Sequence, residues 1–197
     1  MRESDQEERL LLKSVAVGFG CVGKTSALIR YRTGKFVERY VPTVWEEYGQ
    51  SGELDGKPYR LCLWDTGGAE DYDRLRPLNY PETDVFMLLY DVSDSKVRFE
   101  EIHSYWWTEL NRFCPDVPII LVGSKTDLRD SYREGIETIS FEEGEAMAER
   151  IGAVKYMEIS SLRDEGVTEL FAEVVKVGYE FKVSAKHDGK KKKCVIT

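Results

Sequence analysis

Short apolar stretches alternate along the chain with longer stretches in which apolar residues recur at helical spacing. The strand-like stretches cover residues 10–17, 44–54, 59–64, 85–90, 117–122 and 156–159. Helical spacing predicts helices over residues 25–31, around 99–110, over 140–151 and from 167 onward. Because strands and helices alternate, we expect an α/β fold with a mostly parallel sheet covered by helices on both faces. The turn signal Asp55-Gly56-Lys57 makes the second and third strands an antiparallel pair.

The first predicted strand leads directly into Gly18-Phe19-Gly20-Cys21-Val22-Gly23-Lys24-Thr25, and the first predicted helix follows. A strand, a GxxxxGK[ST] loop and a helix in this order are typical of a phosphate-binding loop. Its glycines let backbone N–H groups surround phosphate oxygens, and the helix directs its positive end at them. We expect Lys24 to reach the β- and γ-phosphates and the Thr25 hydroxyl to bind Mg²⁺. A turn that binds nothing is the alternative, which the complete motif disfavours.

An aspartate at the end of another strand fits the second half of such a site. Asp65 ends the strand 59–64 and is followed by Thr66-Gly67-Gly68. We expect its carboxylate to hold Mg²⁺ through water, and the Gly68 N–H to contact a γ-phosphate. Taken alone, this is also an ordinary strand-to-turn aspartate. The phosphate loop is what favours the nucleotide interpretation.

Two polar segments follow later strands and bear on which base is bound. They are Gly123-Ser124-Lys125-Thr126-Asp127 and Ser160-Ser161-Leu162, and each lies where ligands of open α/β sheets bind. The Asp127 carboxylate can accept hydrogen bonds from two donors on the edge of guanine, a pattern that adenine lacks. Lys125 can lay its aliphatic stem along the base, and the N–H groups of the second segment can donate to the guanine oxygen. Either segment alone is equally well an ordinary polar turn.

Length and composition limit the classes of protein. The 197 residues favour one domain over residues 10–181, between a flexible N-terminal extension (1–9) and a tail (182–197). No apolar run reaches the ~20 residues that span a bilayer, and we expect no secretory signal at the start. The four cysteines are scattered, which indicates neither a zinc site nor a disulfide framework and favours a reducing compartment.

Charge divides the chain into two parts. The net charge is −8, but residues 182–197 hold six lysines and one aspartate, so residues 1–181 carry −13. An acidic body binds nucleic acid poorly, and we expect no such partner. The tail places Lys190–Lys193 directly before Cys194-Val195-Ile196-Thr197, a C-a-a-X motif. This combination predicts prenylation of Cys194 and attraction to anionic lipid, with farnesyl or geranylgeranyl left open. A solubilising tail with an incidental cysteine is the alternative.

Two longer motifs resemble those of one family. Tyr40-Val41-Pro42-Thr43-Val44 is similar to the first switch of the Rho/Rac family of small GTPases, within the Ras superfamily. Trp64-Asp65-Thr66, followed by Glu70-Asp71-Tyr72-Asp73-Arg74-Leu75-Arg76-Pro77-Leu78 and Tyr80, resembles its second switch almost letter for letter. The resemblance covers about residues 11–181 and the C-terminal motif. It implies a Ras-like P-loop NTPase fold, with a six-stranded sheet of which one strand is antiparallel.

The resemblance also implies a set of site residues. Thr43 would be the Mg²⁺ ligand of the first switch, and Phe36 would pack edgewise on guanine. The implied catalytic groups are Lys24, Thr43 and Gly68, and the implied metal ligands are Thr25, Thr43 and Asp65. The implied nucleotide contacts are Gly18, Gly20, Cys21, Val22, Gly23, Lys24, Thr25, Ser26, Phe36, Tyr40, Thr43, Gly68, Ser124, Lys125, Asp127, Ser160, Ser161 and Leu162.

The largest departure from the family is Ala69, where the family has the glutamine that orients the attacking water and assists an incoming arginine finger. Alanine has no hydrogen-bonding side chain. We therefore expect slow intrinsic hydrolysis and a poor response to an activating protein. The alternative is that another group positions the water and turnover is ordinary.

Smaller departures concern the switches, the base and the partners. Gly67 replaces alanine and adds backbone freedom. Ser124 replaces asparagine or threonine, which predicts lower affinity for guanine with specificity kept by Asp127. Glu47 replaces asparagine and makes the effector-facing loop more acidic. The Rho-type insert is reduced, since residues 129–138 have room for at most a short turn of helix.

The resemblance implies a molecular switch that binds GTP or GDP with Mg²⁺ and hydrolyses GTP to GDP and phosphate. The alternative is a largely non-hydrolysing protein that stays loaded with GTP and is controlled by exchange, expression or membrane extraction. An ATP-using enzyme is disfavoured by Asp127. Implied partners of the monomeric domain are exchange factors, activating proteins, a dissociation inhibitor, and effectors of actin or signalling that contact both switches. The expected location is the cytoplasm and the cytoplasmic face of membranes, above all the plasma membrane.

Overall fold

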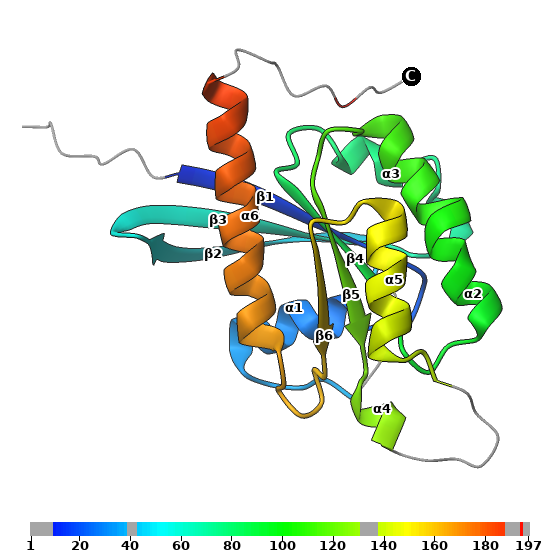
Figure 1. Ribbon diagram of the computed structural model, residues 1–197. Coiled ribbons are helices and arrows are strands. Elements are labelled where there is room, and N and C mark those ends of the chain that lie inside the picture. Colours follow the sequence, from blue (N-terminus) through cyan, green and yellow to red (C-terminus); the bar gives the residue numbers. More distant parts are fainter. Residues whose placement is uncertain (1–9, 39–42, 131–137, 188–193, 195–197) are drawn as a thin grey trace, which may run out of the picture.

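The computed structural model describes residues 10–38, 43–130, 138–187 and 194. Its six strands form one sheet in the order β2-β3-β1-β4-β5-β6 (Figure 1). Neighbouring strands are parallel except for the antiparallel pair β2 and β3. The strands are β1 (Leu10–Val17), β2 (Trp45–Leu54), β3 (Lys57–Thr66), β4 (Val85–Asp91), β5 (Ile119–Ser124) and β6 (Lys155–Ile159). The predicted fold class is confirmed, including its single antiparallel strand.

Helices cover both faces of the sheet (Figure 1). One continuous helical segment consists of α2 (Lys96–Glu101), a π-helical stretch (Ile102–Trp107) and α3 (Thr108–Phe113). The other helices are α1 (Lys24–Thr33), α4 (Asp127–Asp130), α5 (Phe141–Ile151) and α6 (Val167–His187), with 3₁₀ turns at Glu70–Tyr72 and Arg76–Asn79. The helices α1 and α6 pack on one face, while α3 and α5 pack on the other.

The side chains of β4 divide the core into two layers. Phe86, Leu88 and Tyr90 pack with the α3 and α5 layer, whereas Val85 and Met87 pack with the α1 and α6 layer. All five are buried. A strand that is covered on both faces has to be apolar throughout, which is why the continuous apolar run over 85–90 predicted a central strand correctly.

Some predicted boundaries move. Helix α6 ends at His187, beyond the predicted end of the folded domain at residue 181. The predicted N-terminal extension, Tyr40, most of the shortened insert and most of the tail lie outside the described residues. Among the helices that the structure describes, none has the length and apolar character needed to cross a membrane.

The expectation of no disulfide is wrong. Cys114, just past α3, and Cys194 form a disulfide with their Cα atoms 4.5 Å apart. No local pattern predicts this pair, because its members are 80 positions apart in the sequence and only the fold brings them together. Cys21 and Cys62 are free thiols. The sulfur predicted to carry a prenyl group is therefore bonded to Cys114 in this structure.

Candidate functional site

The carboxyl ends of the parallel strands and the start of α1 surround a cavity of about 350 Å³. Ten of the predicted site residues line it: Gly20, Cys21, Gly23, Lys24, Thr25, Ser26, Phe36, Thr43, Gly68 and Lys125. The other described ones lie outside the lining: Leu162 is exposed, and the buried ones are Gly18, Val22, Asp65, Ser124, Asp127, Ser160 and Ser161. Tyr40 lies outside the described residues. Segments that are distant in sequence thus meet at one site, as the motifs predicted.

Lys24 is the charged group at the centre of the phosphate loop. Its side chain is buried, and its Nζ donates hydrogen bonds of 2.7 Å to the carbonyl oxygens of Gly18 and Phe19. Burial lowers the pKa of Lys24 to about 8, and the negative charge of Asp65 opposes this effect. An ammonium group in this position, beside the N-terminus of α1, is stabilised by an anion that replaces its lost hydration. The loop therefore fits a phosphate group.

Three oxygen-bearing side chains converge beside Lys24. The Thr25 hydroxyl donates to Asp65 Oδ2 over 2.5 Å and lies 3.1 Å from the Thr43 hydroxyl oxygen. The other carboxylate oxygen, Asp65 Oδ1, is buried without a hydrogen-bond partner in the described part of the chain. Burial raises the pKa of Asp65. Hydroxyl and carboxylate oxygens are the ligands that Mg²⁺ prefers, so these residues fit the predicted metal.

Gly68 lies directly against the phosphate loop. A Cβ at Gly68 would be 2.3 Å from the Gly18 carbonyl oxygen and 2.5 Å from the Gly20 nitrogen. No side chain fits this approach, so glycine is required here for steric reasons. The backbone of Gly68 therefore lies directly against the loop that is predicted to bind phosphate, and its contact with a terminal phosphate stays a prediction.

Gly67 connects the two switch segments. Its N–H donates to the Val44 carbonyl over 2.9 Å, and its own carbonyl accepts from Arg76. A Cβ at Gly67 would meet the Tyr72 ring at 2.5 Å and the Thr43 carbonyl oxygen at 2.8 Å. The sequence indicated added freedom at Gly67; the structure adds that the packing of Tyr72 and Thr43 depends on it.

The base-binding elements are linked to one another. The Ser160 hydroxyl donates to Asp127 Oδ1 over 2.5 Å, and Lys125 pairs with Asp91 at 2.7 Å. The Ser124 hydroxyl lies within hydrogen-bond range of the carbonyls of Tyr90 and Val22. The contact with Val22 connects the base-binding segment to the phosphate loop. The sequence did not predict this role for Ser124.

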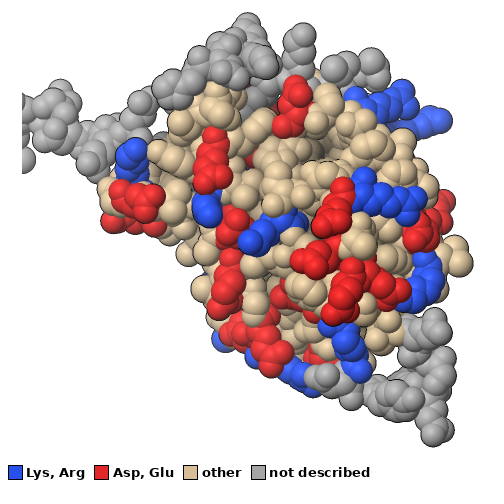
Figure 2. Space-filling model, viewed as in Figure 1, with Lys and Arg blue, Asp and Glu red and all other residues tan. Residues whose placement is uncertain are grey.

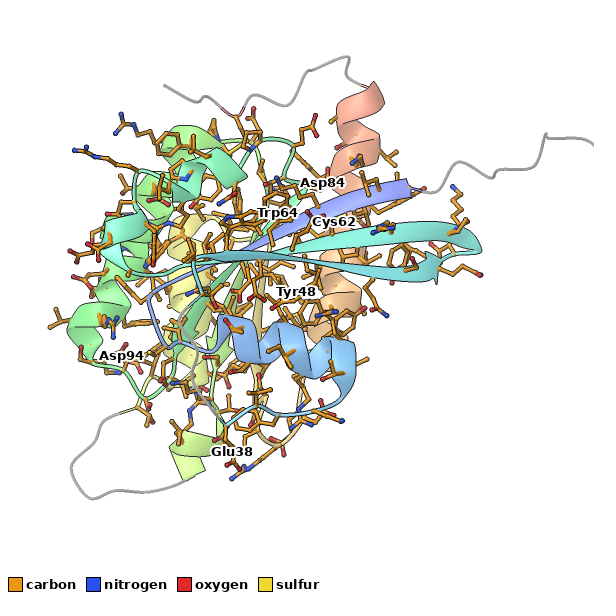
Figure 3. All side chains as sticks on the ribbon, turned by 180° about the vertical axis from the view of Figure 1, so that it is seen from behind. Glu38, Tyr48, Cys62, Trp64, Asp84 and Asp94 are labelled. Atoms are coloured by element: carbon orange, nitrogen blue, oxygen red, sulfur yellow. A yellow bond between two sulfur atoms is a disulfide. The ribbon has the colours of Figure 1, made fainter. Side chains whose placement is uncertain are left out.

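Two residues at the site were missed at the sequence level. Arg30 Nε donates to the Ser161 carbonyl over 2.7 Å, and its Nη2 donates to the Leu162 carbonyl over 3.0 Å. Arg30 therefore fixes the third base-binding element from α1, a contact across more than a hundred residues that no local pattern reveals. Glu38 lines the cavity at the same end of the molecule as α4 (Figure 3). Its position two residues after Phe36, a predicted site residue, is the one feature of the sequence that could have indicated its place at the site.

Ala69 directly follows Gly68, which lines the cavity. It is exposed and has an extended backbone, and the first 3₁₀ turn begins after it. Its methyl group can neither donate nor accept a hydrogen bond. Position 69 thus has no side chain that could hold a water molecule by a hydrogen bond.

The strand–loop–helix phosphate site, the oxygen cluster for Mg²⁺ and the carboxylate at the base-binding end together define a P-loop nucleotide-binding protein of the GTPase class. The sequence model of the Ras family matches residues 13–179. The chain therefore belongs to the Ras family, whose members are small GTPases that act as molecular switches.

Proposed function

We propose that this chain is a Rho-type GTP-binding switch whose hydrolysis step is slow, so that GTP rather than GDP is the prevailing bound nucleotide. The observation that carries this proposal is the combination of a complete phosphate site with Ala69 at the water-orienting position. The switch motifs around Thr43 and between Trp64 and Tyr80 support the Rho-type assignment.

The residues of the site take separate roles in this proposal. Lys24 and the N–H groups at the start of α1 bind the β- and γ-phosphates, while Asp127 and Lys125 select guanine. Thr25, Thr43 and Asp65 would hold Mg²⁺, which when bound neutralises charge that develops on the phosphate oxygens. The Gly68 N–H orients the terminal phosphate. The side chain of residue 69 contributes nothing to positioning water, so the barrier to hydrolysis stays high.

Effectors and regulators would contact the two switch segments. Large apolar side chains are exposed there: Val44 and Trp45 beside Thr43, and Leu75 and Leu78 in the second switch. Trp45 stacks on Trp64 with ring centroids 5.6 Å apart, which gives this surface a rigid aromatic part. Such a surface suits a protein partner. We include exchange factors, activating proteins and a dissociation inhibitor among its partners.

A lipid anchor completes the proposal. Reduced Cys194 would carry a prenyl group, and Lys190–Lys193 would add attraction to anionic lipid at the cytoplasmic face of membranes, above all the plasma membrane. On the face shown in Figure 2, the described residues carry interspersed acidic and basic side chains rather than a continuous basic surface.

The nucleotide that co-purifies with the protein tests the proposal. The protein is isolated rapidly in the presence of Mg²⁺, denatured, and its nucleotide identified by chromatography. We expect mostly GTP from the wild type and mostly GDP from Ala69→Gln prepared in parallel. Predominant GDP from both proteins would support an ordinary hydrolysing switch instead, and ATP would overturn both readings.

A further inference from the structure

Cys194 is the residue on which the proposed lipid anchor depends, yet its sulfur is bonded to Cys114 in the structure. We propose that Cys194 is the site of two mutually exclusive modifications, a reversible disulfide with Cys114 and the attachment of a prenyl group. This inference rests on the proposed anchor, because without lipid attachment the disulfide has nothing to exclude.

The surroundings of the pair hold both sulfurs in place. Cys114 is 2% exposed, and Cys194 is half-buried against the same core layer. The Cys114 and Cys194 Sγ atoms lie 3.9 and 3.3 Å from the carbonyl oxygen of Tyr80. Only a thiol can donate to that oxygen, so the Tyr80 carbonyl offers a shared acceptor in the reduced state. The tail cysteine therefore has a binding position next to Cys114 before the bond forms.

The fold lets the tail reach this position. Cys114 borders a cavity of about 660 Å³ whose opposite wall includes Val177, Phe181 and Ser184 of α6. The last turns of α6 and the end of α3 lie at the same end of the molecule (Figure 1). Seven Cα–Cα steps link His187 to Cys194 and span at most roughly 25 Å, so Cys194 stays close to this end. That tether raises the local concentration of its thiol at Cys114.

The two other cysteines are placed differently. Cys21 belongs to the phosphate loop. Cys62 lies on β3 near Trp64 and Asp84 (Figure 3), and burial raises the pKa of its thiol. A raised pKa leaves less of the reactive thiolate. Cys62 is therefore a suitable control for a substitution that leaves the pair intact.

Glutathione disulfide is a sufficient oxidant for closing the pair. The Cys194 thiolate attacks it, and one glutathione leaves; the Cys114 thiolate then attacks the mixed disulfide at Cys194 and releases the second. Two protein thiols are oxidised, and one glutathione disulfide is reduced to two glutathione molecules. Reduction runs in reverse and starts at Cys194, because Cys114 is buried.

Prenylation needs the same sulfur in a different form. The Cys194 thiolate displaces diphosphate from the first carbon of an isoprenoid diphosphate, an S–C bond forms, and the thiol proton is released. A sulfur atom that is bonded in a disulfide is not available as the thiolate nucleophile that this reaction needs. An oxidised protein therefore keeps its tail on the body of the domain, and a reduced one can be anchored.

The test uses the full chain produced in bacteria, as wild type, Cys114→Ser and the control Cys62→Ser. Each is equilibrated with glutathione disulfide or with excess glutathione, quenched in acid, alkylated after denaturation and mapped by mass spectrometry. Parallel samples, freed of glutathione, are incubated with a farnesyltransferase and farnesyl diphosphate, or with a geranylgeranyltransferase and geranylgeranyl diphosphate. Cys114→Ala is a second variant in case the serine disturbs folding. Retention of bound nucleotide shows whether each variant is folded.

We expect a Cys114–Cys194 cross-linked peptide in oxidised wild type and in Cys62→Ser, and lipid attachment at least about tenfold slower than in the reduced forms. Cys114→Ser should form no such cross-link and should carry glutathione on Cys194 in the oxidised sample, while its reduced form should be prenylated as fast as reduced wild type. Absence of the cross-link, or Cys194 linked to another cysteine, would overturn the inference. A cross-link that forms normally while reduced wild type and Cys114→Ser both fail to accept either lipid would overturn the anchor and the competition, and leave the disulfide alone.

Discussion

The backbone N–H of Gly67 donates to the carbonyl of Val44 over 2.9 Å and so joins the two switch segments directly. Two further contacts surround this bond. A Cβ on residue 67 would lie 2.5 Å from the Tyr72 ring and 2.8 Å from the Thr43 carbonyl oxygen. Because Thr43 also reaches the Thr25 hydroxyl, a displacement at Gly67 is transmitted to the proposed Mg²⁺ ligands.

Gly67→Ala tests this connection. An added methyl group must displace Tyr72 or Thr43, which we expect to destabilise the protein by about 1–3 kcal/mol and to speed the release of labelled GDP at limiting Mg²⁺. Gly178→Ala is the control, since a Cβ there makes ordinary contacts of 3.5 Å or more in α6. Adding Tyr72→Ala to Gly67→Ala should recover part of the loss. Unchanged melting and release in Gly67→Ala would show that the switch segments are not coupled in this way.

The buried ion pair between Arg76 and Glu109 supports the second switch from α3. Arg76 Nη2 lies 2.9 Å from Glu109 Oε2, with side chains 1% and 13% exposed, and Arg76 also donates to the Gly67 carbonyl. Glu109→Ala leaves a buried guanidinium without its main partner. We therefore expect the free energy of unfolding, measured in denaturant, to fall by about 3 kcal/mol. Glu100→Ala, which breaks the exposed pair with Arg150, should cost less than about 1 kcal/mol. Equal losses in the two variants would contradict this account.

Asp127→Asn tests the selection of guanine. A carboxylate can accept from both donors on the edge of guanine, whereas an amide supplies only one acceptor and adds a donor. We expect affinity for GTP to fall by about 10- to 100-fold, while affinity for the xanthine nucleotide, which has an oxygen in place of the amino group, rises. Competition against a fluorescent guanine nucleotide measures both. Retained preference for guanine would place base recognition elsewhere.

Local patterns predicted the strands, the phosphate loop and the strand-end aspartates, because each follows from neighbouring residues. The apolar run of β4 and the motif from Gly18 to Thr25 are examples of such signals. Contacts between distant segments were not predictable: Arg30 with the Ser161 carbonyl, Arg76 with Glu109, and Cys114 with Cys194 all depend on the finished fold. The disulfide contradicts the prediction, drawn from the scattered positions of the cysteines, that the chain has none.

The central claim is that Ala69 makes hydrolysis slow in a site that otherwise binds GTP well. Ala69 is exposed, so a longer side chain fits there without disturbing the core. Ala69→Gln restores a group that can orient water, whereas Ala69→Leu adds similar bulk without hydrogen bonding and serves as the control.

Single-turnover decay of bound GTP in the presence of Mg²⁺ is the most direct measurement. We expect Ala69→Gln to hydrolyse GTP at least about tenfold faster than the wild type and Ala69→Leu to remain slow. A wild-type rate equal to that of Ala69→Gln would contradict the account.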